Sequence, residues 1–274
     1  MNKNIGIIGF GNMGSAIAGR LAGEFKVTVF DQDKTKTAGL KEIKVAVDSS
    51  AVLRGSETVI LAVKPQDFRA LLDEIREEAK EKLIISIAAG ITTASIEKAL
   101  RRARVVRAMP NLPARIGKGM ICISAGSSAG KEDLEFARRL FTKSGEVLVL
   151  KEEMIDAATA VSGSGPGYLY QWCQGKSSEE AAEYVNKKFI PALEEAAAGI
   201  GFTPQEAGLL ARTTAKGSLA FLEASHATPA ELTKQVASKG GTTEAGLAVL
   251  RSGGSLSVAV KAAKTMAEVL SRKE

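Results

Sequence analysis

The sequence predicts an α/β domain followed by an all-α domain. In the first 150 residues, apolar runs of four to six residues alternate with segments of helical periodicity. This alternation is typical of a doubly wound parallel sheet with helices on both faces. After Leu150 the chain shows no convincing strand, and helical periodicity dominates. We therefore expect two domains, over residues 1–150 and 151–274.

Each strand of the first domain is predicted from an apolar run. The expected strands are 5–8, 27–30, 58–63, 83–87, 104–108, 120–124 and 147–150. Pro65 closes the third run and Pro110 the fifth, because proline cannot continue a central strand. The apolar spacing between the runs predicts helices at 15–21, 68–80, 93–102 and 131–143.

The second domain is predicted to contain helices throughout. Their ranges are 152–161, 167–174, 178–198, 204–224, 230–236, 243–250 and 255–271. Gly175 is typical of a helix end, and Ser177 followed by Glu180 is typical of a capping box. Pro191 is expected to kink the helix in which it lies.

A glycine motif lies between the first strand and the first helix. It reads Gly9-Phe10-Gly11-Asn12-Met13-Gly14. Such a motif alone is weak evidence, but at a strand-to-helix turn it predicts a Rossmann-like dinucleotide site. Glycines allow the backbone to approach a pyrophosphate, and the helix N-terminus stabilises the negative charge. Lys64, at the end of a parallel strand, is expected to contact the same cofactor.

The cofactor is expected to be NADH or NADPH. Asp31 ends the second strand, at the distance expected for an acid that hydrogen-bonds the adenosine ribose. An acid there disfavours a 2′-phosphate, which points to NADH. Lys34 and Lys36 follow closely and could neutralise such a phosphate, so both cofactors stay open.

A second motif near the C-terminus, from Ala237 to Leu247, predicts a site for a small anionic ligand. Gly240 and Gly241 allow a sharp turn, and Ser238, Thr242 and Thr243 carry hydroxyls. The N–H groups at the start of the following helix can hold a carboxylate. Thr243 could equally cap this helix, and the two roles are compatible.

The composition excludes several classes of protein. The net charge of +6 is spread along the chain, and no basic run is interleaved with aromatics, so we expect no nucleic-acid partner. We expect no membrane partner and a cytoplasmic location, since no apolar stretch reaches bilayer length and no signal pattern is present. Cys122, Cys173 and the single histidine, His226, form no metal-ligand pattern, and we predict no metal.

Six motifs together resemble the pyrroline-5-carboxylate reductase family, in order and along nearly the whole chain. The glycine motif is shared with many dehydrogenases, whereas the last two motifs are the most specific. The six motifs are Ile8–Gly14, Ala62–Gln66, Ser86–Gly90, Val106–Asn111, Ser162–Pro166 and Ser238–Thr243.

The resemblance implies a Rossmann domain that binds NADPH or NADH and a C-terminal α-helical dimerisation domain. It implies a homodimer through the C-terminal helices, with a decamer of five such dimers as the larger assembly of the family. Each active site would lie where one subunit's cofactor faces its partner's loop. The substrate would be a cyclic imine carboxylate. Hydride transfer to its C=N carbon would give L-proline, with the protein supplying position rather than a strong acid or base.

The resemblance also implies roles for single residues. Thr243 would be the catalytic contact, hydrogen-bonding the substrate nitrogen, while Ser238 and the backbone of Gly240, Gly241 and Thr242 would hold the substrate carboxylate. The remaining implied residues contact the cofactor. They are Gly9, Gly11, Asn12, Met13 and Gly14 at the pyrophosphate, Ala62, Val63, Lys64 and Pro65 near the nicotinamide ribose, and Ala88, Ala89, Met109 and Asn111 by the nicotinamide.

Several alternatives stay open. Asn111 could be a turn former between two prolines, and Arg107 is expected to be a solvated charge. The chain departs from the family at Gly167, where alanine is usual, and in a longer segment between Tyr168 and Gly201. A β-hydroxyacid dehydrogenase or another imine reductase is the second enzyme hypothesis, and a dinucleotide-sensing binding protein is the non-enzyme hypothesis.

Overall fold

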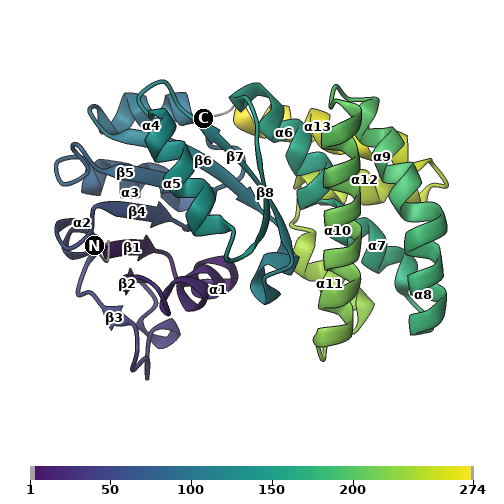
Figure 1. Cartoon of the computed structure of the whole chain (residues 1–274), viewed down its shortest axis with the longest axis horizontal. Coiled ribbons are helices and arrows are strands. Elements are labelled where there is room, and N and C mark those ends of the chain that lie inside the picture. Colours follow the sequence, from purple (N-terminus) through teal and green to yellow (C-terminus); the bar gives the residue numbers. More distant parts are fainter. Residues whose placement is uncertain (1–3, 273–274) are drawn as a thin grey trace. The chain divides into compact units, whose positions relative to one another are not determined.

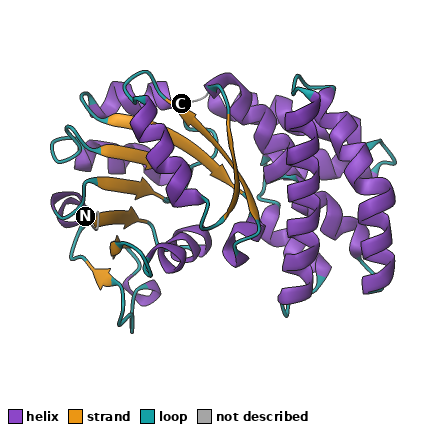
Figure 2. Cartoon of the chain, viewed as in Figure 1, coloured by secondary structure: helices purple, strands orange, loops and turns teal. Residues whose placement is uncertain are grey.

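The computed structural model describes residues 4–272 and has the predicted α/β and all-α parts (Figures 1 and 2). The chain packs into two compact units. Of the described residues, the first unit comprises 4–108 together with Ile123–Glu152, and the second comprises Met109–Cys122 and 153–272. The segment Met109–Cys122, which ends strand β6 (Arg104–Pro110) and begins strand β7 (Gly119–Ala125), thus packs with the helices.

The strands within residues 4–272 form one sheet of eight, in the order β3-β2-β1-β4-β5-β6-β7-β8. The pairs from β3 across to β6 are all parallel. Strand order reverses direction at β1, which pairs with β2 on one side and β4 on the other. Ligands of such sheets bind at the carboxyl ends of the strands beside this reversal. The bounds are β1 (Asn4–Ile8), β2 (Lys26–Phe30), β3 (Lys44–Val45), β4 (Thr58–Leu61), β5 (Leu83–Ser86), β6 (Arg104–Pro110), β7 (Gly119–Ala125) and β8 (Gly145–Val149).

Strands β6 and β7 are an antiparallel exception in a mostly parallel sheet. The Gly126 N–H donates to the Val105 carbonyl at 2.9 Å, and the Met120 N–H donates to the Asn111 side chain at 2.9 Å. The connection from Asn111 to Lys118 is shorter than the dozen residues that a parallel crossover requires. Strand β6 also continues through Pro110, beyond its predicted end at residue 108, because it stays paired up to this turn.

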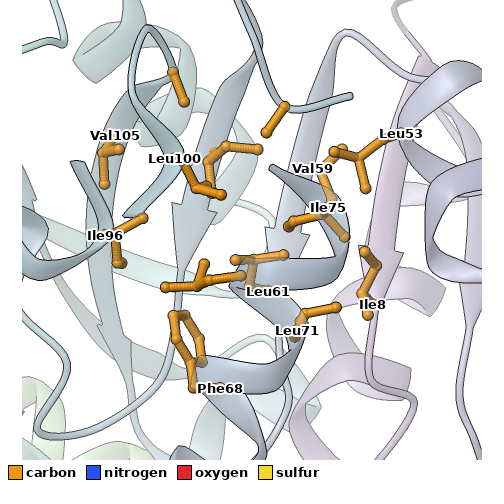
Figure 3. Packing of buried hydrophobic residues seen from close by; sticks show 14 of the residues in the cluster. Ile8, Leu53, Val59, Leu61, Phe68, Leu71, Ile75, Ile96, Leu100 and Val105 are labelled. Atoms are coloured by element: carbon orange, nitrogen blue, oxygen red, sulfur yellow. The ribbon is translucent and has the colours of Figure 1, made fainter. Parts of the chain in front are cut away.

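Helices cover the sheet of the first unit, and one apolar cluster lies under α2, α3 and α4 (Figure 3). Phe68 and Ile75 from α3 and Leu100 from α4 pack there against Val59 and Leu61 of β4. Burying side chains of this size contributes roughly 1.5–3 kcal/mol each. The helices are α1 (Asn12–Leu21), α2 (Ser49–Arg54), α3 (Pro65–Ile75), α4 (Thr93–Leu100) and α5 (Lys131–Phe141).

One predicted helix of the first unit needs correction, and two elements were missed. Helix α3 spans Pro65–Ile75 rather than 68–80, and the chain after it turns toward β5 through Glu81, which has a positive φ of 62°. Helix α2 and the two-residue edge strand β3 were not predicted. Both are too short to show a hydrophobic period.

The second unit is helical, as predicted, and helix α10 has the predicted bounds. Thr203 and Glu206 form a capping box at its start, which fixes the first residue. The helices are α6 (Ile155–Ala158), the π-helical turn η4 (Thr159–Gly163), α7 (Gly165–Cys173), α8 (Ser178–Tyr184), the π-helical turn η5 (Val185–Phe189), α9 (Ile190–Ala198), α10 (Pro204–Ala224), α11 (Pro229–Val236), α12 (Thr242–Arg251) and α13 (Leu256–Ser271). Across both units, the part of the chain that the structure describes also has the short 3₁₀ turns η1 (Lys34–Lys36), η2 (Leu112–Ile116) and η3 (Glu152–Met154).

The long segment after Tyr168 forms two helical pieces, as predicted. Gly175, with φ of 73°, ends the first, and the Ser177–Glu180 capping box begins the second. The second piece runs through α8, η5 and α9. Its π-helical turn directly precedes Pro191, whose ring would otherwise meet the carbonyl of Lys187.

No helix within residues 4–272 is both long enough and apolar enough to span a bilayer.

Candidate active site

The glycine turn after β1 is held by contacts that only glycine allows at two of its positions. Gly9 has a φ of 98°, and a Cβ there would lie 2.6 Å from the carbonyl of Ala62. A Cβ on Gly14 would lie 2.0 Å from the carbonyl oxygen of Gly9. The end of β1, the start of α1 and the end of β4 therefore meet backbone to backbone.

Gly11 differs from its two neighbours in the motif. A Cβ built on Gly11 would meet no atom within 4 Å, so packing inside the chain does not require glycine there. Gly11 is the N-cap of α1, it makes no side-chain cap, and the first turn holds no acidic residue. The first N–H groups of a helix have no partner within it. An open backbone surface with unpaired N–H groups fits a phosphate of a dinucleotide.

A cavity of about 260 Å³ opens at this turn, at the carboxyl ends of β1, β2 and β4. Of the predicted cofactor residues, Gly9, Gly11, Asp31, Ala62, Val63 and Lys64 line it. The remaining lining residues are Ile8, Phe30, Gln32, Asp33, Lys36, Ser49, Asp67, Leu71 and Glu74. The cavity thus joins an apolar wall to a strongly charged rim.

Asp31 organises the rim of this cavity. Its carboxylate accepts hydrogen bonds from the Phe10 N–H at 2.7 Å and the Asp33 N–H at 2.9 Å, and pairs with Lys36 at 3.1 Å. Burial favours the neutral acid, but these hydrogen bonds and the Lys36 charge outweigh it and hold the pKa of Asp31 below its usual value. The carboxylate is therefore ionised at neutral pH.

The other predicted cofactor residues do not line the cavity. Asn12 and Ala89 are exposed, Ala88 belongs to the apolar cluster under α2, α3 and α4, and Pro65 is the first residue of α3. Met13 is half-buried and Gly14 buried within α1. Met109 and Asn111 belong to the second unit. Their contacts with a cofactor stay predictions.

The structure adds lining residues that sequence reasoning missed. Ser49, Asp67 and Glu74 lie on α2 and α3, and the Ser49 hydroxyl donates to the Glu74 carboxylate. Asp67 could have been found, since it follows the predicted Lys64 by three residues at a helix start. Ser49 and Glu74 carry no local signal, because only the pairing of two helices brings them together.

The C-terminal motif forms a compact turn at the start of α12. The Gly240 N–H donates to the Glu244 carboxylate at 2.5 Å, and the Gly241 N–H donates to the Ser238 carbonyl at 3.0 Å. The Ser238 hydroxyl lies over Gly241, where a Cβ would meet it at 2.3 Å. Two of the N–H groups predicted for the substrate thus have partners within the chain, and one of these partners is itself a carboxylate.

Thr243 follows this turn and is buried. Its hydroxyl donates to the Ser164 hydroxyl at 3.1 Å, and Ser164 donates to Thr242 at 3.2 Å. The motifs Ser162–Pro166 and Ser238–Thr243, far apart in the sequence, therefore meet within the second unit. Sequence reasoning predicted each motif but not this contact.

Asn111 has a structural role that Pro166 explains. Proline has no N–H, so Pro166 cannot donate the usual helical hydrogen bond to the Ser162 carbonyl four residues earlier. The Asn111 side-chain N–H₂ donates to this carbonyl at 3.1 Å, while its oxygen accepts from the Met120 N–H at 2.9 Å. Asn111 therefore fastens the β6–β7 turn to the π-helical turn η4 inside the second unit.

Arg107 corrects the expectation of a solvated charge. It is 1% exposed, and its guanidinium pairs at 3.1 Å with Glu152, which also accepts from the Thr93 N–H at 3.1 Å. A buried guanidinium needs such a partner.

Both cysteines, Cys122 and Cys173, are buried and free. Burial raises the pKa of Cys122 to about 12 and that of Cys173 to about 11. Within residues 4–272, no cluster of three potential His, Cys, Asp or Glu metal ligands forms.

Two family models match the chain, one in each half. Residues 4–90 match "NADP oxidoreductase coenzyme F420-dependent", and residues 184–272 match "pyrroline-5-carboxylate reductase dimerisation". A pyrroline-5-carboxylate reductase of Synechocystis is 32% identical over 272 residues, covering 96% of each chain.

The chain belongs to the pyrroline-5-carboxylate reductase family. Solved structures agree with this assignment. A pyrroline-5-carboxylate reductase from Coxiella burnetii is 30% identical, with a TM-score of 0.66 and 99% of each chain covered. The Plasmodium falciparum pyrroline carboxylate reductase, solved with NADP bound, is 25% identical, with a TM-score of 0.64 and 98% of each chain covered.

The glycine turn yields a matched pair of substitutions. We expect Gly11→Ala to change the free energy of unfolding by less than about 1 kcal/mol, since its methyl meets open space, but to weaken NAD(P)H binding at least about 10-fold. Gly14→Ala should instead destabilise the fold by roughly 1–3 kcal/mol, because its methyl strikes the Gly9 carbonyl.

Thermal unfolding and fluorescence titration with NADH and NADPH measure both effects. Unchanged affinity in Gly11→Ala, with the fold intact, would contradict a phosphate site at this turn.

Proposed function

We propose that the protein reduces 1-pyrroline-5-carboxylate to L-proline with NAD(P)H, the last step of proline biosynthesis. The observation that carries this proposal is the relationship along 96% of the chain to a pyrroline-5-carboxylate reductase. The two sites supply what the reaction needs: a dinucleotide cavity in the first unit, and a hydroxyl and N–H cluster in the second.

In the first unit, the open N-terminus of α1 would hold the pyrophosphate at Gly11, Asn12 and Met13. Gly9 and Gly14 shape this turn through their backbone contacts. The apolar wall from Ile8, Phe30, Val63 and Leu71 would receive the adenine ring. When bound, the nicotinamide supplies a hydride.

Further along the cofactor we propose the contacts that the resemblance implies. Asp31 would bind the adenosine ribose, and Ala62, Val63, Lys64 and Pro65 would lie near the nicotinamide ribose. Ala88, Ala89, Met109 and Asn111 would lie by the nicotinamide ring.

In the second unit, Thr243 would contact the ring nitrogen of the substrate. Ser238 and the N–H groups of Gly240, Gly241 and Thr242 would hold its carboxylate. The Gly240 N–H already binds a carboxylate, that of Glu244 at 2.5 Å, which supports the same chemistry for a ligand. Glu244 would release this N–H when substrate binds.

The charges of the cavity favour NADH over NADPH. Asp31 and Asp33 lie at the end of β2, and Asp31 is kept ionised by its hydrogen bonds. Lys36 forms an ion pair with Asp31 at 3.1 Å, so its attraction for a 2′-phosphate is weaker than that of an unpaired cation. We therefore propose NADH as the better cofactor.

We also propose that residues 1–150 act as the cofactor domain and 151–274 as the substrate-binding and dimerisation domain. The match of residues 184–272 to a dimerisation family supports a homodimer through the C-terminal helices. Assembly into decamers and a cytoplasmic location are the corresponding larger expectations.

Thr243→Ala tests the reaction and the substrate site together. Wild-type protein should consume NADH or NADPH only when pyrroline-5-carboxylate is present. Thr243→Ala should lower kcat/KM by roughly 10- to 100-fold, the effect of losing one hydrogen bond to a charged group. Affinity for the cofactor should stay at the wild-type value, because the cofactor cavity is lined by first-unit residues.

Thr243→Ser, which keeps the hydroxyl, should retain most activity. No consumption by wild-type protein with either cofactor would remove the proposed reaction. An equal fall of activity and stability in Thr243→Ala would make the residue structural.

Asp31→Asn tests cofactor choice. The amide oxygen can still accept from the Phe10 N–H, whereas the charge that repels a 2′-phosphate is lost. The ratio of kcat/KM for NADPH to that for NADH should rise about 10-fold. Lys36→Met, which removes a cation from the same rim, should lower this ratio. Unchanged ratios in both variants would show that this end of β2 does not read the ribose.

Light scattering after size-exclusion chromatography tests assembly. The expected mass is an even multiple of the 28.7 kDa chain, with the dimer as the smallest species. A single-chain mass at micromolar concentration would contradict the homodimer.

A further inference from the structure

The hydroxyls around Thr243 are arranged with a direction. Thr243 donates to Ser164 at 3.1 Å, and Ser164 in turn donates to Thr242 at 3.2 Å. A serine hydroxyl has one proton. Because the Ser164 hydroxyl donates its one hydrogen bond to Thr242, it can only accept a hydrogen bond from Thr243. The Thr243 hydroxyl therefore donates to Ser164, and its oxygen has lone pairs left to accept a further hydrogen bond.

Two glycines fix the rotamer that makes this arrangement possible. A Cβ on Gly167 of α7 would lie 2.6 Å from the Thr243 methyl, and a Cβ on Gly246 of α12 would lie 2.3 Å from the Tyr168 hydroxyl. Each helix thus carries a notch for a side chain of the other. Threonine is stiff about χ1, so seating its methyl against Gly167 also sets the direction of its hydroxyl.

The cluster can orient a ligand and contains no carboxylic acid or ammonium group. Its members, Ser164, Tyr168, Thr242 and Thr243, are all uncharged hydroxyls. Burial raises the pKa of the Tyr168 phenol, against a smaller opposing effect of Ser164. The Tyr168 hydroxyl is buried and makes no hydrogen bond of normal length.

We infer that Ser164 is a positioning residue that holds Thr243 as a hydrogen-bond acceptor, so that the site selects the N-protonated iminium form of the substrate. This inference rests on the proposed reduction. The iminium N–H donates to the Thr243 oxygen. Hydride adds to the ring carbon, the C=N π pair moves onto nitrogen, and nitrogen keeps the proton that it carried. In this step no proton has to come from the protein.

The test compares two ring ligands of similar shape and opposite polarity. L-Proline presents an N–H₂⁺ donor at the ring position, and tetrahydrofuran-2-carboxylate presents an oxygen acceptor. Calorimetry with the full-length chain saturated with oxidised cofactor gives both dissociation constants. Wild-type protein should prefer proline. In Ser164→Ala the Thr243 hydroxyl no longer donates to Ser164 and can donate to the ligand. Proline should then bind more weakly and tetrahydrofuran-2-carboxylate more tightly. The ratio of the two dissociation constants should change about 10-fold in favour of the latter, the effect of one hydrogen bond.

Ser162→Ala is the matched control. Its hydroxyl lies in the same turn and is equally buried, but it donates to the Ala158 carbonyl at 2.9 Å and not to Thr243. This variant should keep the wild-type preference. Ser164→Cys, with a weaker acceptor, should fall between wild type and Ser164→Ala.

A loss of affinity for both ligands by the same factor in Ser164→Ala, or an equal change in Ser162→Ala, would overturn the positioning role and leave the proposed reduction standing. Absence of pyrroline-5-carboxylate turnover in the wild type would instead overturn the reduction and this inference together.

Discussion

The first unit depends on a backbone contact in which three strand ends meet at Gly9. The Gly9 N–H donates to the Phe30 carbonyl of β2 at 2.8 Å, and the Ala62 N–H, just beyond β4, donates to the Ile8 carbonyl at 2.7 Å. A side chain at Gly9 would strike Ala62. With the turn pressed into the sheet, the N-terminus of α1 points outward over open space, and the cavity follows from that geometry.

The second unit uses the same physical device between helices. Gly167 and Gly246 let α7 and α12 interlock, and a Cβ on Gly217 of α10 would lie 2.1 Å from the carbonyl of Lys118. Glycine in a helix costs about 1 kcal/mol relative to alanine. At Gly167 the helix propensity predicts only this loss. The structure shows that the absence of a side chain there makes room for the methyl group of Thr243. The cost is offset by a close approach that places Thr243 against Ser164.

The sequence predicted what depends on local pattern. Helix α10 has its predicted bounds because Thr203 and Glu206 form a capping box and Pro204 is the first helical residue. The glycine turn was predicted as a ligand site, and the cavity lies at this turn. Arg107 could not be predicted, since its burial depends on Glu152, 45 residues away. The same limit applies to Asn111, whose side-chain amide donates to the Ser162 carbonyl, 51 residues away.

The residues of the candidate site were therefore easier to predict than the direction of their hydrogen bonds. Which group donates and which accepts decides the chemistry. The N–H groups of Gly240 and Gly241 suggest an anion site from sequence alone, yet both have partners inside the chain. Thr243 can donate or accept as an isolated side chain. Its hydroxyl donates to Ser164, which itself donates to Thr242, and this leaves the Thr243 oxygen to accept a hydrogen bond from a ligand. In the role that we propose for this cluster, the proton that makes the ring carbon electrophilic arrives with the substrate.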